Sequence, residues 1–143
     1  MKYIKKKLTI YKVKVENIAK KFDTPTYCYS YTQLKKNINN FKKNFKSFSP
    51  LICFAVKSNT NLNLIREIQK FGLGADVVSM GELMMTLKAG INPKKIVFSG
   101  VGKTSNEISY AIDKKILLIN AESKSEINEI DRIARIKKKK VQI

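Results

Sequence analysis

The sequence predicts an α/β protein in which parallel strands alternate with helices. From residue 51 onward, short apolar runs typical of buried strands alternate with segments whose apolar residues recur at helical spacing. Before the helical segments from residue 80 onward, a Ser or Thr is followed three residues later by Glu, which is the spacing of a capping box. Glycine, asparagine or lysine residues follow the expected helix ends.

Before residue 50 the expected elements are short. In order, they are a strand over 8–15, one or two helical turns over 16–22, a strand over 26–29, and a helix through Phe45. The first segment alternates well enough for a half-exposed strand, and Asp23-Thr24-Pro25 stops the first helix. Ser30 and Gln33 have capping-box spacing, so we expect the longer helix to start there.

Residues 51–143 contain four predicted strand–helix units. Their strands are 51–56, 75–78, 95–98 and 116–119; their helices are 62–71, 80–89, one after Thr104 and one after Ser123; a fifth strand begins at 141–143. This alternation implies parallel pairing with right-handed crossovers. A closed eight-stranded βα barrel takes about 250 residues. The 143-residue chain is therefore expected to form about half a barrel, and periodicity alone leaves an open doubly wound sheet as the competing architecture.

The composition restricts the possible partners. The formal charge of +18 fits a basic nucleic-acid-binding module, which we keep as an alternative. Only three basic residues are arginines, the better side chain for bidentate phosphate recognition, so no specific nucleic-acid partner is expected. No apolar run reaches the length of a membrane span, and no signal peptide is recognisable, so a soluble cytoplasmic protein is expected. Histidine is absent and the cysteines Cys28 and Cys53 are far apart, so no metal site is expected.

Both cysteines lie in runs that we expect to be buried strands, as reduced thiols. Lys57 ends the second of these runs, the one that contains Cys53. If the strand continues, Cys53, Ala55 and Lys57 share one face of the sheet. Burial there would lower the pKa of Lys57 from about 10.4 and give a nucleophilic amine able to form a Schiff base. The alternative is a lysine beyond the strand end that points into water.

Several motifs carry a family resemblance. The segment 54–59 (Phe-Ala-Val-Lys-Ser-Asn), followed by Leu64-Ile65, Ile68 and Gly72, resembles the pyridoxal-phosphate attachment signature of the ornithine, diaminopimelate and arginine decarboxylases. The segment 76–82 resembles the family's Asp-Val-Val-Ser-x-Gly-Glu run, and 98–103 with 120–123 resembles the diaminopimelate-specific members most. The resemblance implies a βα barrel of the alanine-racemase/decarboxylase type joined to a β domain. Residues 1–22 would belong to the β domain, and 23–143 would form the amino-terminal half of the barrel.

The resemblance also implies roles for individual residues. Lys57 would attach pyridoxal 5'-phosphate, and Ala55 would leave room for it. Asp76 would lie beside the lysine and favour a protonated amine; the alternative is an aspartate satisfied by backbone amides at a strand start. Ser79 and Glu82 match the family but are explained as a helix cap. The segment 99–103 (Ser-Gly-Val-Gly-Lys) is a weak candidate for a phosphate cradle.

The implied reaction is decarboxylation of meso-diaminopimelate to L-lysine in lysine biosynthesis, with an amino acid as substrate and a homodimer as the full-length enzyme. The family's cofactor-stacking histidine, glycine-rich phosphate loop and substrate-binding residues have no counterpart here. We therefore expect the chain to be incomplete and inactive by itself. Two alternatives stay open: a pyridoxal-phosphate barrel protein without decarboxylase activity, and a half that pairs with another chain.

Overall fold

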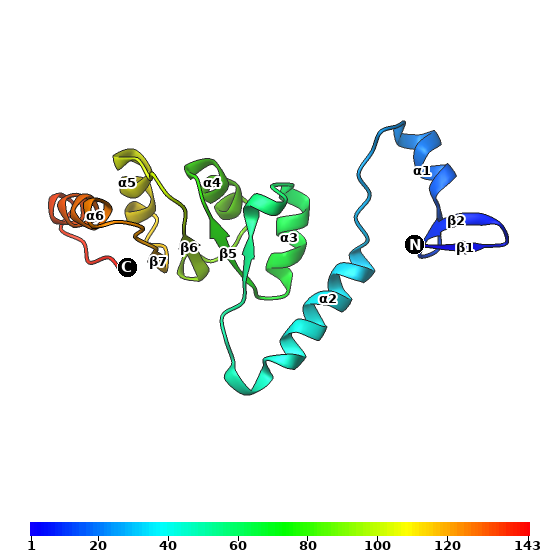
Figure 1. Ribbon diagram of the computed structural model, residues 1–143, viewed down its shortest axis with the longest axis horizontal. Coiled ribbons are helices and arrows are strands. Elements are labelled where there is room, and N and C mark those ends of the chain that lie inside the picture. Colours follow the sequence, from blue (N-terminus) through cyan, green and yellow to red (C-terminus); the bar gives the residue numbers. More distant parts are fainter. The chain divides into compact units, whose positions relative to one another are not determined.

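The structure, a computed structural model, describes all 143 residues. They form two compact units, Met1–Ser49 and Pro50–Ile143, which are described separately (Figure 1). The first unit contains β1 (Lys2–Ile4), β2 (Lys7–Ile10), β3 (Val13–Lys14), α1 (Val15–Phe22), α2 (Tyr31–Asn44) and the short 3-10 helix η1 (Lys46–Phe48). Its three strands form an antiparallel sheet in the order β1-β2-β3.

Both helix predictions for this unit are confirmed, whereas the strand predictions need correction. The expected strand over 8–15 is two strands, β2 and β3, separated by a turn at Tyr11, whose φ is 55°. The expected strand over 26–29 is wrong, because these residues pair with no other strand and Tyr27 is 91% exposed. Cys28 is consequently exposed rather than buried, as a free thiol.

The capping box predicted at the start of α2 is only half formed. The Ser30 hydroxyl accepts a hydrogen bond from the backbone N–H of Gln33, at 3.3 Å. The Gln33 side chain does not accept the backbone N–H of Ser30, the second bond of a capping box. It instead accepts from the Tyr11 hydroxyl and donates to Asn37. The serine therefore caps the helix, while the glutamine ties it to the turn between β2 and β3.

The second unit contains the four predicted strand–helix repeats. In chain order its elements are β4 (Cys53–Ala55), the 3-10 helix η2 (Val56–Ser58), α3 (Leu62–Lys70), β5 (Gly74–Val77), α4 (Met80–Lys88), η3 (Pro93–Lys95), β6 (Ile96–Phe98), α5 (Ser105–Asp113), β7 (Leu118–Ile119) and α6 (Lys124–Ile136). The four strands are parallel and lie in the order β4-β5-β6-β7. Figure 1 shows α4, α5 and α6 following β5, β6 and β7 in turn.

Burial alternates along these strands and shows which face the helices cover. The face covered by the helices is completely buried at Ala75, Val77, Ile96, Phe98 and Ile119, and partly buried at Phe54 of β4; Val56, directly after β4, is also completely buried. These side chains pack with helix residues such as Ile65, Leu83, Ile108 and Ile130 in one core. The other face, which includes Cys53, Ala55, Asp76, Val97 and Leu118, is only partly buried. Helices on one face and strands in sequential order fit a partial βα barrel rather than a doubly wound sheet, which has helices on both faces.

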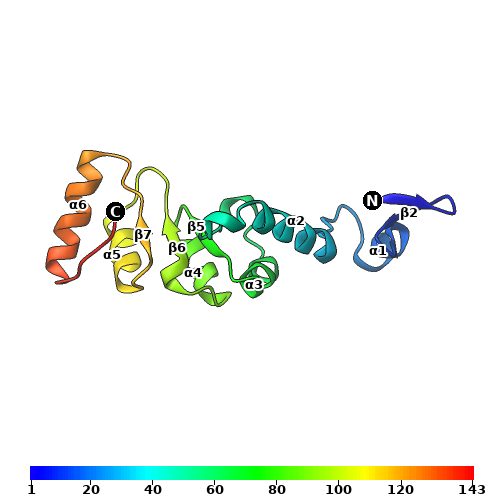
Figure 2. The same cartoon turned by 90° about the horizontal axis from the view of Figure 1, so that it is seen from below.

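The last residues approach the open edge of this sheet. The backbone N–H of Ile119 donates to the carbonyl of Gln142, at 3.0 Å, and Figure 2 shows the carboxyl-terminal stretch returning beside β7. The expected fifth strand over 141–143 forms no regular strand in the structure. None of the helices combines the length and apolar character that a membrane span requires.

The predicted caps of α4, α5 and α6 are confirmed. Thr104 and Glu107 form a complete capping box. The hydroxyls of Ser79 and Ser123 likewise accept from the backbone N–H groups of Glu82 and Glu126. These two glutamates each bind a backbone N–H one residue before the capping serine, at Val78 and Glu122. Each cap thereby fixes the loop that leads from a strand to the next helix.

Candidate active site

Lys57 lies at the carboxyl end of β4, in the turn η2. This turn is held by two hydrogen bonds, from the Ser58 hydroxyl to the carbonyl of Ala55 and from the backbone N–H of Asn59 to the carbonyl of Val56. Because the strand ends at Ala55, the alternation that would place Lys57 on the sheet face stops before it. The predicted burial of Lys57 is therefore wrong for this chain: its side chain is exposed and forms no hydrogen bond or ion pair within it.

The strand that precedes Lys57 carries small side chains and lies beside an acidic residue of β5. Ala55 is the register partner of Asp76 on the neighbouring strand β5, and Cys53 is the partner of Gly74. Burial raises the pKa of the Cys53 thiol, and the negative charge of Asp76 raises it further. The thiol and the carboxylate therefore belong to one partly buried face. The structure thus places Ala55 and Asp76, two of the predicted site residues, side by side just before the turn that carries Lys57.

Asp76 is held by side chains rather than by backbone amides. Its Oδ1 accepts a hydrogen bond from the Ser99 hydroxyl at 2.6 Å. The Ser99 oxygen in turn accepts from the Asn120 side-chain amide at 2.9 Å. These three residues lie at or just beyond the ends of β5, β6 and β7. They form a polar chain along the carboxyl edge of the sheet, where ligands bind in βα barrels.

A buried ion pair supports this edge. The Lys103 ammonium lies 3.2 Å from the Glu126 carboxylate, and their side chains are only 2% and 8% exposed. The ammonium also donates to the carbonyls of Gly100 and Asn120, at 2.6 and 2.7 Å. Burial acts most strongly on Glu126 and would raise its pKa, but hydrogen bonds from the Glu122 backbone N–H and from Lys103 outweigh it and leave the pKa below its ordinary value.

The geometry changes the interpretation of the segment 99–103. A lysine has three N–H donors, and those of Lys103 are occupied by two carbonyls and one carboxylate. Lys103 is therefore a structural cation and not a phosphate ligand. The sequence places Ser99 and Asn120 directly after predicted strands, at the carboxyl edge where ligands bind, and Ser99 within the weak phosphate candidate 99–103, but it indicates no individual role for either residue.

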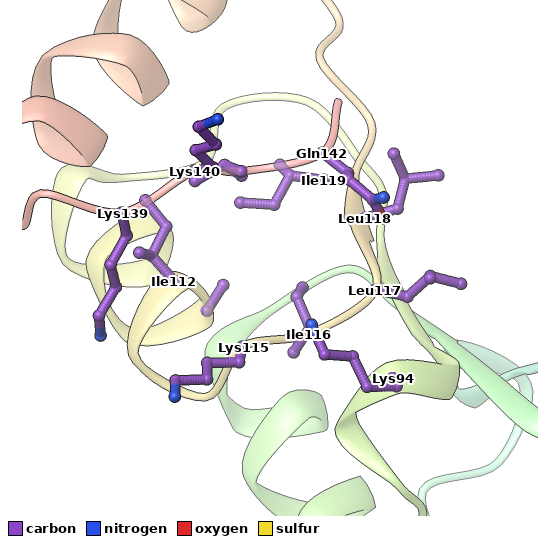
Figure 3. A pocket seen from close by; sticks show the side chains of 12 residues that line it. Lys94, Ile112, Lys115, Ile116, Leu117, Leu118, Ile119, Lys139, Lys140 and Gln142 are labelled. Atoms are coloured by element: carbon purple, nitrogen blue, oxygen red, sulfur yellow. The ribbon is translucent and has the colours of Figure 1, made fainter.

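A separate hollow lies at the opposite, amino-terminal edge of the sheet. It has a volume of about 400 Å³ and an apolar floor that includes Ile112, Ile116 and Ile119. Figure 3 shows lysine side chains around it, those of Lys94, Lys115, Lys139 and Lys140. Since 26 of the 143 residues are lysines (29 basic residues less three arginines), a lysine rim is expected around any surface hollow of this chain. None of the candidate site residues lines it.

Residues 31–143 match the family model described as "Pyridoxal-dependent decarboxylase, pyridoxal binding domain". The chain belongs to this family. Among its pyridoxal-dependent relatives, the diaminopimelate decarboxylase of Helicobacter pylori strain J99 is 44% identical over 119 residues, which cover 83% of this chain and 29% of the relative. The diaminopimelate decarboxylase of Aquifex aeolicus is 41% identical over 134 residues, which cover 94% of this chain and 31% of the relative.

Solved structures support the same family assignment. The crystal structure of AQ1208 from Aquifex aeolicus matches with a TM-score of 0.94 and 41% identity, over 98% of this chain and 35% of that one. The diaminopimelate decarboxylase from M. jannaschii matches with a TM-score of 0.94 and 34% identity, over 98% and 34% of the two chains. The partial barrel predicted from the sequence is thereby confirmed. The chain spans about 30% of the length of the curated relatives it matches.

Proposed function

We propose that this chain is the pyridoxal-binding part of an enzyme that decarboxylates meso-diaminopimelate to L-lysine, with Lys57 as the amine that attaches pyridoxal 5'-phosphate. The observation that carries the proposal is the position of Lys57: a free amine at the carboxyl edge, two residues after Ala55 and beside the strand of Asp76. Membership of the pyridoxal-dependent family supports the cofactor. The names of the relatives support the substrate, as does the Helicobacter pylori enzyme crystallised with L-lysine.

The residues present fit the reactive part of the cofactor. Lys57 offers an exposed amine without a competing partner. The methyl side chain of Ala55 leaves space on the partly buried sheet face that it shares with Asp76, and Asp76 contributes a negative charge that favours a neighbouring cation. When bound, the cofactor supplies an electron sink for the carbanion left by departing carbon dioxide. The segment 99–103 does not fit the phosphate, because Lys103 is already satisfied within the fold.

The proposal extends to the organisation of the enzyme. Residues 1–22 contribute to a β domain, residues 23–143 form the amino-terminal half of the barrel, and the full-length enzyme is a cytoplasmic homodimer. Free thiols at Cys28 and Cys53 fit a reducing compartment. The 143-residue chain alone is expected to release no carbon dioxide from meso-diaminopimelate. Measurable release by the purified chain would overturn this part of the proposal.

The attachment site is tested by covalent labelling. The purified chain is incubated with pyridoxal phosphate, reduced with borohydride, digested, and analysed for the modified lysine. We expect Lys57 to carry most of the label, although it is one of 26 lysines. Lys88, an exposed lysine at the end of α4, is the matched control. Substitution Lys57→Ala should remove most of the label and Lys88→Ala almost none. Equal labelling of Lys57 and Lys88 in the unmodified chain would contradict the proposal.

A further inference from the structure

We infer that Ser99, Asn120 and Lys103 are positioning residues of this site, which fix the Asp76 carboxylate so that it favours the positively charged form of the group attached at Lys57. This inference rests on the proposed attachment at Lys57. It adds to that proposal a hydrogen-bonded network that joins three strand–helix units. Ser99, Asn120 and Lys103 act through Asp76 and are not themselves expected to contact the cofactor.

The hydrogen bonds that join Asn120, Ser99 and Asp76 run in one direction. Asn120 can only donate through its side-chain nitrogen, so the Ser99 oxygen is the acceptor of that bond. The Ser99 proton is then free to point at Asp76, and the 2.6 Å separation is typical of a hydroxyl bound to a carboxylate. One carboxylate oxygen is thus fixed. The other, Oδ2, accepts no hydrogen bond within the chain and is available to a cation.

Asn120 is itself held in place by its backbone groups. Its backbone N–H donates to the carbonyl of Phe98 at 2.9 Å, and its own carbonyl accepts from the Lys103 ammonium at 2.7 Å. Both backbone groups of Asn120 are therefore held while its side chain reaches Ser99. Lys103 is fixed in turn by Glu126, with an ammonium that is almost inaccessible to water. The buried pair of Lys103 and Glu126 thus fixes the backbone of Asn120 through its carbonyl, and the Asn120 side chain orients Ser99.

The hydrogen-bonded side chains Asp76, Ser99 and Asn120 lie where the apolar part of the sheet ends. The residues that precede it on the same strand face, Val97 and Leu118, are apolar and partly buried. The polar side chains begin where the strands end, at the edge that carries Lys57. A fold that only needed packing could continue the apolar pattern here. An oriented carboxylate is useful where a cation must be held, and the proposed amine at Lys57 supplies that cation.

The test is a mutant cycle read by labelling of Lys57. In the 143-residue chain, Ser99→Ala should lower the reduced pyridoxal-phosphate label at Lys57, relative to Lys88, by about tenfold, the effect of losing a hydrogen bond to a charged group. Asn120→Ala removes a hydrogen bond to a neutral hydroxyl and should lower the label by about fivefold. Ser99→Thr keeps the hydroxyl and should stay within about twofold of the unmodified chain. Ser105→Ala, which removes a hydrogen bond to Glu129 away from the site, is the control and should leave the ratio unchanged.

The decisive comparison uses Asp76→Asn. If Ser99 acts through the Asp76 charge, Ser99→Ala should cause no further loss in a chain that already carries Asp76→Asn. An equal loss in both backgrounds would make Ser99 a merely structural residue and overturn the inference. A second readout needs no cofactor: the Asn120 side-chain amide signal in NMR spectra should shift on Ser99→Ala and not on Ser105→Ala. An unmoved signal would also overturn the inference.

The two proposals fail in different ways. Selective labelling of Lys57 that Ser99→Ala and Asn120→Ala leave unaltered would refute the positioning chain and keep the attachment site. Absence of selective labelling in the unmodified chain would refute the attachment site and, with it, this inference.

Discussion

Replacing Lys103 by methionine should destabilise the second unit more than any exposed lysine substitution. Methionine keeps much of the apolar length of the side chain but leaves the Glu126 carboxylate, only 8% exposed, without its cation. Breaking a buried ion pair from one side costs about 3 to 5 kcal/mol. The carbonyls of Gly100 and Asn120 also lose their donor, so we expect the upper part of this range.

The measurement is urea unfolding followed by far-ultraviolet circular dichroism, with the free energy of unfolding extrapolated to water. Lys88→Met is the matched control. Its lysine is exposed, and the expected change lies within about 0.5 kcal/mol. In the double variant Lys103→Met with Glu126→Gln both charges are absent, while the amide oxygen can still accept from the Glu122 N–H. The double variant should therefore recover about half of the loss.

Two results would refute this reasoning. A loss for Lys103→Met no larger than that for Lys88→Met would mean that the ammonium is hydrated in solution. A double variant as unstable as the single one would mean that the unpaired Glu126 charge is not the source of the loss. If Lys103→Met does not fold at all, the double variant still gives a measurable value, because it leaves no unpaired charge inside the protein.

Neighbouring cations hold the pKa values of Asp113 and Glu129 at about 2. Because these pKa values are lower in the folded state than in the unfolded state, the free energy of unfolding should fall as the pH is lowered from about 4.5 towards about 2. A flat profile of that free energy in urea titrations would contradict this. Gly74→Ala should lower the free energy of unfolding by about 2 to 3 kcal/mol, because its Cβ would clash with the backbone carbonyl oxygen of Lys95. Gly81→Ala in α4 should raise the free energy of unfolding by about 0.5 to 1 kcal/mol, because its Cβ has room there. Equal effects of the two substitutions in thermal unfolding would show that β5 can shift freely. Thiol reagents should modify the exposed Cys28 faster than Cys53, and Asp76→Asn should accelerate the reaction of Cys53; an unchanged rate would place the carboxylate too far from the thiol.

The sequence was most informative where the signals are local. Strand alternation from residue 51 onward and the Ser/Thr-to-Glu spacing depend on neighbours in the chain, so they correctly predicted the four strand–helix units and the helix starts. The hairpins of the first unit were missed because lysines and a tyrosine, instead of glycine or asparagine, adopt positive φ at Lys5, Lys6 and Tyr11. The run 26–29 has strand propensity but no neighbouring strand to pair with.

The candidate site was predictable only in part. Lys57, Ala55 and Asp76 came from a motif, and the structure brings the last two together. Whether Lys57 is buried or exposed could not be decided from the sequence, because alternation does not reveal at which residue a strand turns into a 3-10 helix. The segment 99–103 was only a weak candidate for a phosphate cradle, and the structural role of Lys103 could not be predicted, because its partner Glu126 lies 23 residues away and itself has the sequence pattern of an ordinary cap. Pairings of this kind depend on tertiary structure.

The glutamates of the helix caps have a consequence for how this fold can change. Glu107 accepts not only from Thr104 but also from the backbone N–H of Met80, at the start of the preceding helix, so adjacent repeats are fastened to each other at one rim. The connections at the opposite edge of the sheet, where helices lead into strands, include exposed positions such as those in 89–92 and 114–117. No glutamate side chain joins adjacent repeats there. Natural insertions and deletions should therefore accumulate at that second rim, where they alter loop length without disturbing the spacing of the groups around Lys57.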